Sequence, residues 1–226
     1  MTATPQTKFG AHPPTGAPPV VTRWWWVRHA PVIDGEGRLY GQEDLDCDVS
    51  DLARFQALAR CLPEDAVWIV THLGRTRKTA QGIRDAGASG PEYVVERNFA
   101  EQSFGDWQGL TWAEMEARDR AAYEEFWRDP SGNAPPEGES FADLIGRTGP
   151  AVERLTEIYT GRDIVCVAHG GSIRAAVSQA LDLHHERGLS ISIDTLSLTR
   201  IDHVKGGVLN GNGKAWRIGG VNMVTR

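Results

Sequence analysis

Short apolar runs alternate with amphipathic segments along most of this chain. The apolar runs predict buried strands at residues 24–30, 66–70, 93–95 and 164–168. Apolar side chains at helical spacing predict helices over residues 52–62, 76–86, 111–127, 141–159 and 172–183. The C-terminal part adds β-rich runs at 189–193, 196–201 and 216–221, with a turn at Gly206 and Gly207. Because strands that alternate with helices pair in parallel, we expect an α/β fold of three layers, α/β/α, with a mostly parallel central sheet.

Two of the predicted strands end in a histidine followed by small residues. The first run gives Trp26-Val27-Arg28-His29-Ala30, and the later one gives Val167-Ala168-His169-Gly170-Gly171. In open α/β sheets ligands bind beyond the carboxyl ends of the strands, so we expect both histidines to lie in one pocket. A single histidine at a strand end is more often a structural residue, but the shared context here favours a site.

Arginines accompany the strand ends that this pocket would use. Arg28 precedes His29, and Arg75 follows the second strand. A guanidinium binds phosphate oxygens through paired, charge-assisted hydrogen bonds, and backbone amides at a helix start near Gly170 add donors. These residues predict an anion site. Three histidines, His29, His72 and His169, would be enough to bind zinc, but the neighbouring arginines repel a cation, so we expect no metal.

Five sequence blocks extend this pattern. They are Arg28-His29-Ala30, Arg75 with Thr79-Ala80, Glu101-Gln102-Ser103-Phe104-Gly105-Asp106-Trp107-Gln108-Gly109-Leu110-Thr111, Gly138-Glu139-Ser140 and His169-Gly170-Gly171-Ser172-Ile173-Arg174. In this order they resemble the histidine phosphatase superfamily, and they cover residues 24 to 180. The resemblance implies a phosphoglycerate mutase-like fold and phosphoryl chemistry without a cofactor.

The same resemblance implies the catalytic roles. His29 would be the nucleophile that takes the phosphoryl group, and Arg28, Arg75 and His169 would line the phosphate pocket. Glu101 would protonate the leaving oxygen and then activate water. Physical chemistry agrees, because imidazole attacks through a neutral nitrogen and nearby arginines disfavour its cationic form.

Gly170 and Tyr40 complete the predicted site as substrate-binding residues. The segments around Tyr40 and Phe104–Trp107 resemble α-ribazole phosphatases and sugar-phosphate phosphatases alike, so the substrate is expected only to be a small phosphorylated metabolite. The chain also departs from the family pattern. Residues 31–35 hold no counterpart of the usual phosphate-contacting asparagine, Ala30 replaces a glycine, and Thr71 replaces a serine.

Three functions remain open at this point. The resemblance favours a phosphomonoester hydrolase of the phosphatase branch. A phosphoglycerate mutase uses the same residues but must exclude water from its intermediate, and mutases carry a more basic stretch than residues 102–107 after the acid. A non-catalytic phospho-ligand binding domain has no use for an acid placed like Glu101.

Charge and composition narrow the class of partner. The net charge is −6, from 24 Lys and Arg against 30 Asp and Glu, and no basic run stands out, so we expect neither nucleic acid nor a membrane surface as partner. Three irregularly spaced cysteines do not suit a disulfide framework and favour a cytoplasmic location. No apolar stretch approaches the ~20 residues that span a bilayer.

We divide the chain into a proline-rich leader, residues 1–22, and one domain, residues 23–226. The leader lacks the apolar core of a signal peptide, and we expect it to be flexible. A helical cap insertion near residues 111–139 is expected to cover the active-site edge of the sheet. The β-rich C-terminal part leaves a homodimer through a sheet edge open.

Overall fold

A mixed sheet forms the centre of the computed structural model, which describes residues 19–35, 37–207 and 215–225. Its strands in the described residues are β1 (Val21–Arg28), β2 (Val67–Val70), β3 (Val94–Val95), β4 (Asp163–Ala168), β5 (Leu198–Val204) and β6 (Trp216–Met223). The spatial order is β3-β2-β4-β1-β5-β6. The four strands from β3 to β1 are parallel, and β5 and β6 run antiparallel to their neighbours, so the predicted mostly parallel sheet is confirmed.

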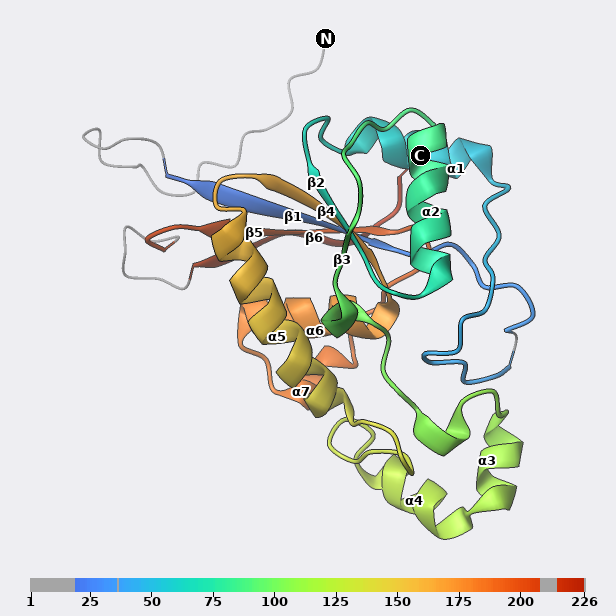
Figure 1. Cartoon of the computed structure of the whole chain (residues 1–226). Helices are drawn as coiled ribbons and strands as arrows, with labels where there is room; N and C mark the ends of the chain where they lie inside the picture. The colour runs from blue at the N-terminus through green and yellow to red at the C-terminus, as the bar shows by residue number, and fades with distance from the viewer. Residues whose placement is uncertain (1–18, 36, 208–214, 226) are drawn as a thin grey trace, which may run out of the picture.

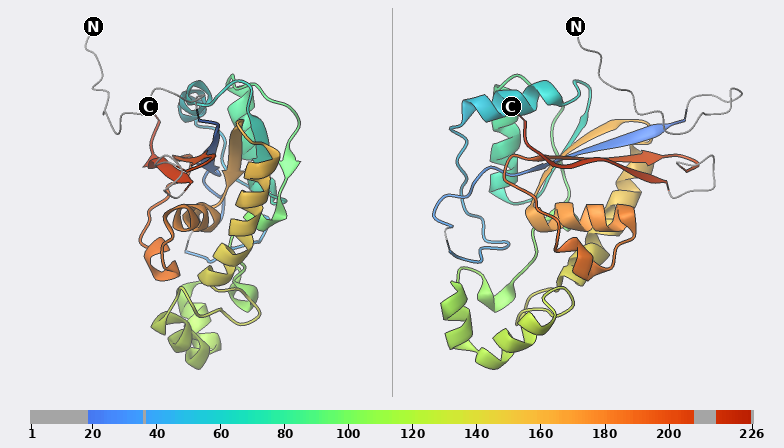
Figure 2. Two further views of the ribbon diagram at one scale, coloured as in Figure 1. Left: turned by 90° about the vertical axis from the view of Figure 1, so that its left-hand side faces the viewer. Right: turned by 180° about the vertical axis from the view of Figure 1, so that it is seen from behind.

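Helices cover both faces of this sheet (Figures 1 and 2). One face carries α1 (Leu52–Cys61) and α2 (Gly74–Asp85), and the other carries α5 (Phe141–Ile158) and α6 (Gly170–Leu181). The side chains of β1 alternate between these layers: Trp24 and Trp26 pack with α5 and α6, whereas Val27 packs with α1 and α2. The three-layer α/β/α architecture expected from the sequence is therefore confirmed.

The strand predicted at residues 189–193 is wrong. This segment follows the short helix α7 (His185–Gly188) and pairs with no strand. Its apolar side chains Ile191 and Ile193 still pack against the core under α6, which accounts for the β-like pattern. Its backbone carbonyls accept hydrogen bonds from arginines of the site instead of a sheet partner.

The single helix predicted over residues 111–127 is also wrong. Two helices occur there, α3 (Trp112–Arg118) and α4 (Arg120–Arg128). Asp119 between them is extended, and its carboxylate caps α4 by accepting from the Ala122 amide at 3.0 Å. Together with the short 3₁₀ turns η1 (Arg97–Phe99) and η2 (Gly105–Trp107) they lead away from the sheet, and α3 and α4 project beyond it at the bottom of Figure 1.

The predicted start of α5 is confirmed, whereas the predicted start of the domain is not. Ser140 is the N-cap of α5, as predicted, and forms a capping box with Asp143. β1 begins at Val21, inside the stretch assigned to the leader, and residues 1–18 lie outside the described part of the chain. In that described part, no helix is long and apolar enough to cross a membrane.

Candidate active site

The two strand-end histidines lie side by side because their strands are neighbours in the sheet. β1 and β4 pair in parallel, with Arg28 opposite Ala168, and the amide of His29 donates to the Ala168 carbonyl at 2.9 Å. The ring centroids of His29 and His169 are 5.2 Å apart, and both side chains are fully buried. The convergence expected from the sequence is thus present at the carboxyl edge of the sheet.

The His29 ring is held in one tautomer. Its Nδ1 lies 2.7 Å from the carbonyl of Ala30, which only accepts, so Nδ1 carries the proton. Burial, the nearby Arg75 and, to a smaller extent, Arg28 lower the pKa of His29 to about 3 against an opposing effect of the Ala30 hydrogen bond. The ring is therefore neutral near pH 7, and its Nε2, buried and without a partner in the described structure, keeps a free lone pair.

Arg75 approaches from the first turn of α2. Its Nη1 and Nη2 donate to the carbonyls of Glu43 and Gly41, both at 2.6 Å, and its Cζ lies 5.3 Å from the ring centre of Tyr40. These contacts hold a fully buried guanidinium in place and leave further N–H groups for a ligand. The Tyr40 ring therefore lies beside this guanidinium, and its role in substrate binding stays a prediction.

Arg28 ends β1 directly beside His29. One terminal nitrogen, Nη1, donates to the Ile193 carbonyl at 2.6 Å. Its Nε is buried and has no partner in the described residues. Gly170 lies against this guanidinium, because a Cβ built on it would be 3.6 Å from Arg28 Cζ. Two unpartnered buried nitrogens, Arg28 Nε and His29 Nε2, therefore belong to consecutive residues, which suits a bound anion.

The orientation of His169 depends on Thr71. Arg75 Nε can only donate, so His169 Nδ1 accepts from it at 3.3 Å and the ring proton lies on Nε2. That N–H donates to Thr71 Oγ1 at 3.0 Å. Burial is the main cause that lowers the pKa of His169 well below its usual value, and the interactions with the second titratable ring, His29, and with the charged Arg75 lower it further. The threonine that departs from the family pattern thus supports a neutral His169.

Glu101 lies at the N-terminal end of α6, next to the histidines. Its Oε1 accepts from the amides of Gly171 and Gln102, both at 3.0 Å. A Cβ on Gly171 would lie only 2.2 Å from that oxygen, so glycine is required there for Glu101 to keep its position. Beside Glu101 opens a cavity of about 200 Å³, which is also lined by Tyr40, Gly171 and Arg174.

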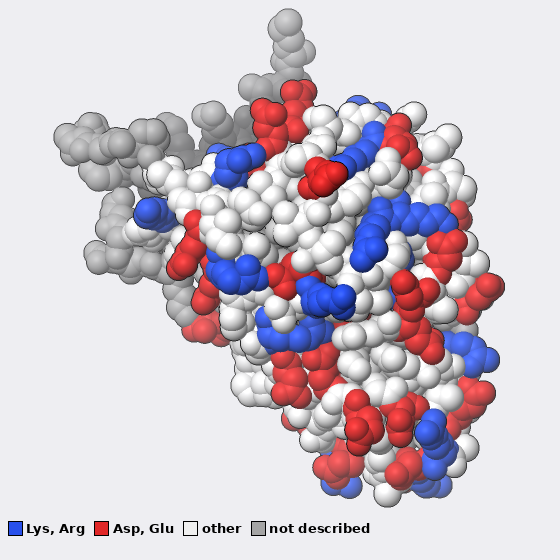
Figure 3. Space-filling model, viewed as in Figure 1, with Lys and Arg blue, Asp and Glu red and all other residues white. Residues whose placement is uncertain are grey.

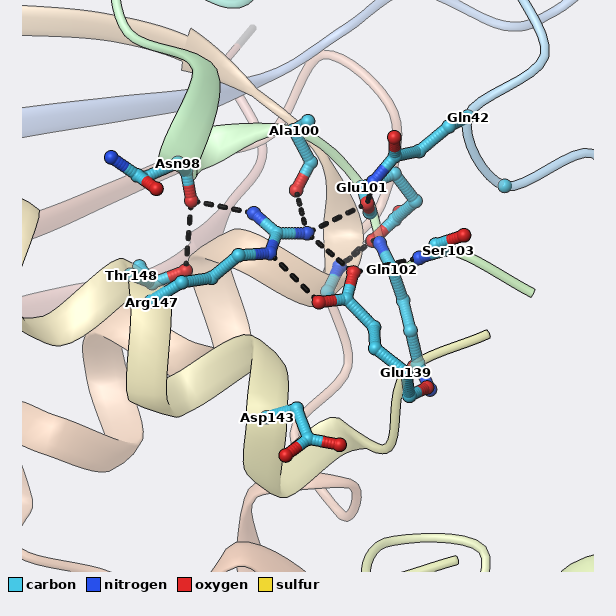
Figure 4. A network of polar contacts seen from close by, with 12 residues as sticks. Gln42, Asn98, Ala100, Glu101, Gln102, Ser103, Glu139, Asp143, Arg147 and Thr148 are labelled. Carbon is cyan, nitrogen blue, oxygen red and sulfur yellow. Dashed lines mark hydrogen bonds and ion pairs between the residues drawn. The ribbon is translucent and has the colours of Figure 1, made fainter. Parts of the chain in front are cut away.

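The backbone around Glu101 is held by Arg147 of α5, a residue that the sequence analysis missed (Figure 4). Arg147 Nη2 donates to the carbonyls of Ala100 at 3.0 Å and Glu101 at 2.9 Å, and Nη1 donates to that of Asn98 at 2.6 Å. Nε and Nη2 also bind both carboxylate oxygens of Glu139, at 2.9 and 2.7 Å. The available signal was an arginine at helical spacing within the apolar face of α5.

Glu139 extends this contact to the next residues of the loop. Its Oε1 accepts from the Ser103 amide at 2.8 Å, and its backbone carbonyl accepts from Gln102 Nε2 at 2.7 Å. Gln42 adds a hydrogen bond from Nε2 to the Glu101 carbonyl at 2.8 Å. The Gly138-Glu139-Ser140 block therefore connects the loop that carries the proposed acid Glu101, here called the acid loop, to the start of α5.

His72 follows β2, and its backbone carbonyl accepts from Arg77. Within residues 19–35, 37–207 and 215–225, no group of three or more His, Cys, Asp and Glu side chains is placed to hold a metal ion. Basic and acidic side chains are interspersed on the face drawn in Figure 3.

Comparison with known proteins agrees with this geometry. The family model of the histidine phosphatase superfamily (branch 1) matches residues 24–210. The chain is 34% identical over 175 residues to glucosyl-3-phosphoglycerate phosphatase of Mycolicibacterium vanbaalenii, a match that covers 72% of this chain and 76% of the relative. It is 29% identical over 160 residues to the metal-independent phosphoserine phosphatase of Arabidopsis thaliana, covering 69% and 67% of the two chains.

Solved structures show the same fold. Mycobacterial glucosyl-3-phosphoglycerate phosphatase superposes with a TM-score of 0.72 at 28% identity, over 90% of this chain and 99% of the other. The α-ribazole phosphatase of Shigella flexneri gives a TM-score of 0.75 at 20% identity over 90% and 97%, a likeness of fold alone. Since the family model spans most of its length, this chain belongs to the histidine phosphatase superfamily, branch 1.

Proposed function

We propose that this phosphomonoester hydrolase acts through a phosphohistidine formed on His29. The state of the His29 ring carries the proposal. Nδ1 is held by the Ala30 carbonyl, and Nε2 is buried without a partner in the described structure. An unsatisfied buried nitrogen costs stability, and such groups are commonly completed by a ligand. A pKa of about 3 keeps its lone pair available at neutral pH.

The residues of the site can supply the nucleophile, the proton and the positive charge that this reaction needs. His29 Nε2 forms a bond to phosphorus as the ester P–O bond breaks, and Glu101 gives its proton to the leaving alcohol oxygen. Water then attacks phosphorus, Glu101 takes a proton from it, and the N–P bond breaks to release phosphate. The unpartnered Nε of Arg28 and the remaining N–H groups of Arg75 stabilise the charge on the phosphoryl oxygens in both steps.

The substrate is a small phosphorylated metabolite. Glucosyl-3-phosphoglycerate and phosphoserine are the first compounds to test, because the relatives reported above are phosphatases of these two molecules. α-Ribazole phosphate is the third, since its phosphatase shares the fold. Fold alone does not select among them.

The deciding experiment compares the wild-type protein with His29→Ala on this panel in excess EDTA. We expect phosphate release from at least one compound and a loss of about 10³-fold or more in the variant. Quenching of the wild-type reaction with detergent at alkaline pH is expected to trap an alkali-stable, acid-labile phosphoenzyme that His29→Ala does not form.

Two outcomes would replace the proposal. With 3-phosphoglycerate added to the panel, its isomerisation without release of phosphate would make the protein a mutase. A folded wild-type protein that binds the compounds but turns over none of them would make it a phospho-ligand binding domain.

A further inference from the structure

Arg174 of α6 points an unpaired guanidinium fork at the cavity beside Glu101. Its Nε donates to the Ile191 carbonyl at 2.7 Å, which fixes the side chain. Neither Nη1 nor Nη2 has a partner in the described residues, although the side chain is half-buried. Burial lowers the pKa of Arg174, but a guanidinium remains charged at neutral pH. A half-buried cation without a protein partner is less well solvated than one in bulk water, so an anion at this fork would be favourable.

The other arginines of the region are already used. Arg75 is held by two backbone carbonyls and His169, and Arg28 lies beside His29 at the phosphoryl position. Arg38 also borders the cavity, but it donates to the Gly109 carbonyl at 2.7 Å and reaches Glu114 at 3.5 Å. Arg174 is therefore the cation at this cavity whose fork has no protein partner among the described residues.

The cavity lies where the alcohol part of the substrate is expected to bind. Glu101 is the proposed acid for the leaving oxygen, and it lies in the cavity wall together with Gly171. The group to which the phosphate is attached must hence enter this cavity when the ester oxygen reaches Glu101. Phe104 and Phe141 form an apolar part of the same wall, which suits a carbon skeleton.

We propose that Arg174 binds an anionic group on the alcohol part of the substrate, a carboxylate or a second phosphate. Both match a planar fork with two parallel N–H donors. This inference rests on the proposed function, since it places the leaving alcohol by reference to Glu101. It names the substrate class as phosphomonoesters that carry a second negative charge.

The test uses matched substrate pairs that differ in that second charge. The pair 3-phosphoglycerate and glycerol 3-phosphate differs by a carboxylate, and the bisphosphate and monophosphate of 1,3-propanediol differ by a phosphate. We expect wild-type kcat/KM to favour the doubly charged member of at least one pair, and the pair that shows the preference identifies the anion. Arg174→Gln is expected to reduce that preference by about 10- to 100-fold, mainly through KM, while the singly charged partner is hydrolysed as before.

Two further variants make the result specific. Arg60→Gln removes an exposed cation from the last turn of α1 and is expected to leave the preference unchanged. Arg174→Lys keeps the charge without the fork and is expected to retain part of the preference. Circular dichroism of each variant checks that it is folded.

The outcomes separate this inference from the proposed function. A wild-type protein without preference in either pair, or an Arg174→Gln variant that loses activity equally on both members of a pair, overturns the role of Arg174 while phosphatase activity stands. Absence of His29-dependent phosphate release from every compound overturns the proposed function instead, and the inference with it.

Discussion

At the scale of single residues, Thr71 determines which nitrogen of His169 carries the proton. Its Oγ1 accepts from His169 Nε2 and from the Leu73 amide, and its own proton can pass only to Thr76 Oγ1, 3.1 Å away. Thr76 Oγ1 in turn donates to the Leu73 carbonyl at 2.9 Å. In this series of hydrogen bonds each hydroxyl can donate to one acceptor only. The neutral tautomer of His169 is therefore fixed by residues outside the pocket.

The substitution Thr71→Val tests this series of hydrogen bonds. Valine has nearly the same shape but leaves the buried Nε2–H of His169 without an acceptor, which costs about 1–3 kcal/mol. We expect the free energy of unfolding to fall by that amount in urea titrations and kcat to fall about tenfold, because the ring is free to turn. Thr71→Ser retains the hydroxyl and should behave like the wild type. A Thr71→Val variant with unchanged stability and kcat would exclude the role.

Gly171 is a second residue whose identity matters, because a larger side chain there would meet Glu101. Its backbone needs no unusual conformation, but a methyl group there would lie 2.2 Å from Glu101 Oε1, so Gly171→Ala must displace the carboxylate. We expect kcat to fall about 10²-fold, the smaller part of what general acid catalysis contributes. Gly146→Ala on the exposed side of α5, where nothing lies within 4 Å, is the matched control and should keep full activity. Equal activity of both variants would contradict the placement of Glu101.

At the scale of elements, the strands that carry the two histidines could be predicted, whereas the connection at residues 189–193 could not. Val27-Arg28-His29 and Val167-Ala168-His169 combine an apolar strand with chemistry at its end, so sequence alone placed both histidines at one sheet edge. The run 189–193 has the same apolar character, but its carbonyls bind arginines from distant elements. Such long-range hydrogen bonds leave no local pattern, and they also account for why Arg147 was missed.

The contact between α5 and the acid loop gives a prediction at this scale. Arg147→Met removes the hydrogen bonds to the Ala100 and Glu101 carbonyls and is expected to loosen Glu101. Good leaving groups need little protonation, so kcat should fall about 10- to 100-fold for an alkyl phosphate and much less for p-nitrophenyl phosphate. Steady-state kinetics on both esters measures the difference.

Arg154→Met is the matched control for that experiment. Arg154 lies two turns further along α5 and pairs with Glu96, so its loss removes a cation and an ion pair from the same helix without touching the acid loop. It should lower stability modestly and leave the ratio of the two rates unchanged. If Arg147→Met also leaves that ratio unchanged, α5 supports the fold and not the acid.

At the scale of the whole molecule, the site is built at a cost in stability. Two fully buried histidines lie against buried arginine, and both have pKa values far below the ordinary value. Net folding stabilities are only about 5–15 kcal/mol, so such groups are a noticeable fraction of the total. The hydrophobic layers on both faces of the sheet must offset this cost, since the sheet edge itself offers the histidines few partners.

The free-energy cost of burying the two neutral histidines should rise as the pH falls. The folded pKa of His29 is about 3 and the unfolded value is 6.5, so between these values the unfolded chain binds a proton that the folded chain excludes. Stability therefore falls as the pH drops through this window, by about 1.4 kcal/mol per pH unit for each such histidine. His169 acts in the same direction.

Urea unfolding at about pH 7 and about pH 5 should show a loss of about 2–4 kcal/mol in the wild type. His29→Gln removes one of the two titrating groups and should lose about half as much. An equal loss in both proteins would mean that folding does not lower the pKa of His29, which would contradict the neutral ring that burial and Arg75 are expected to enforce across this pH range.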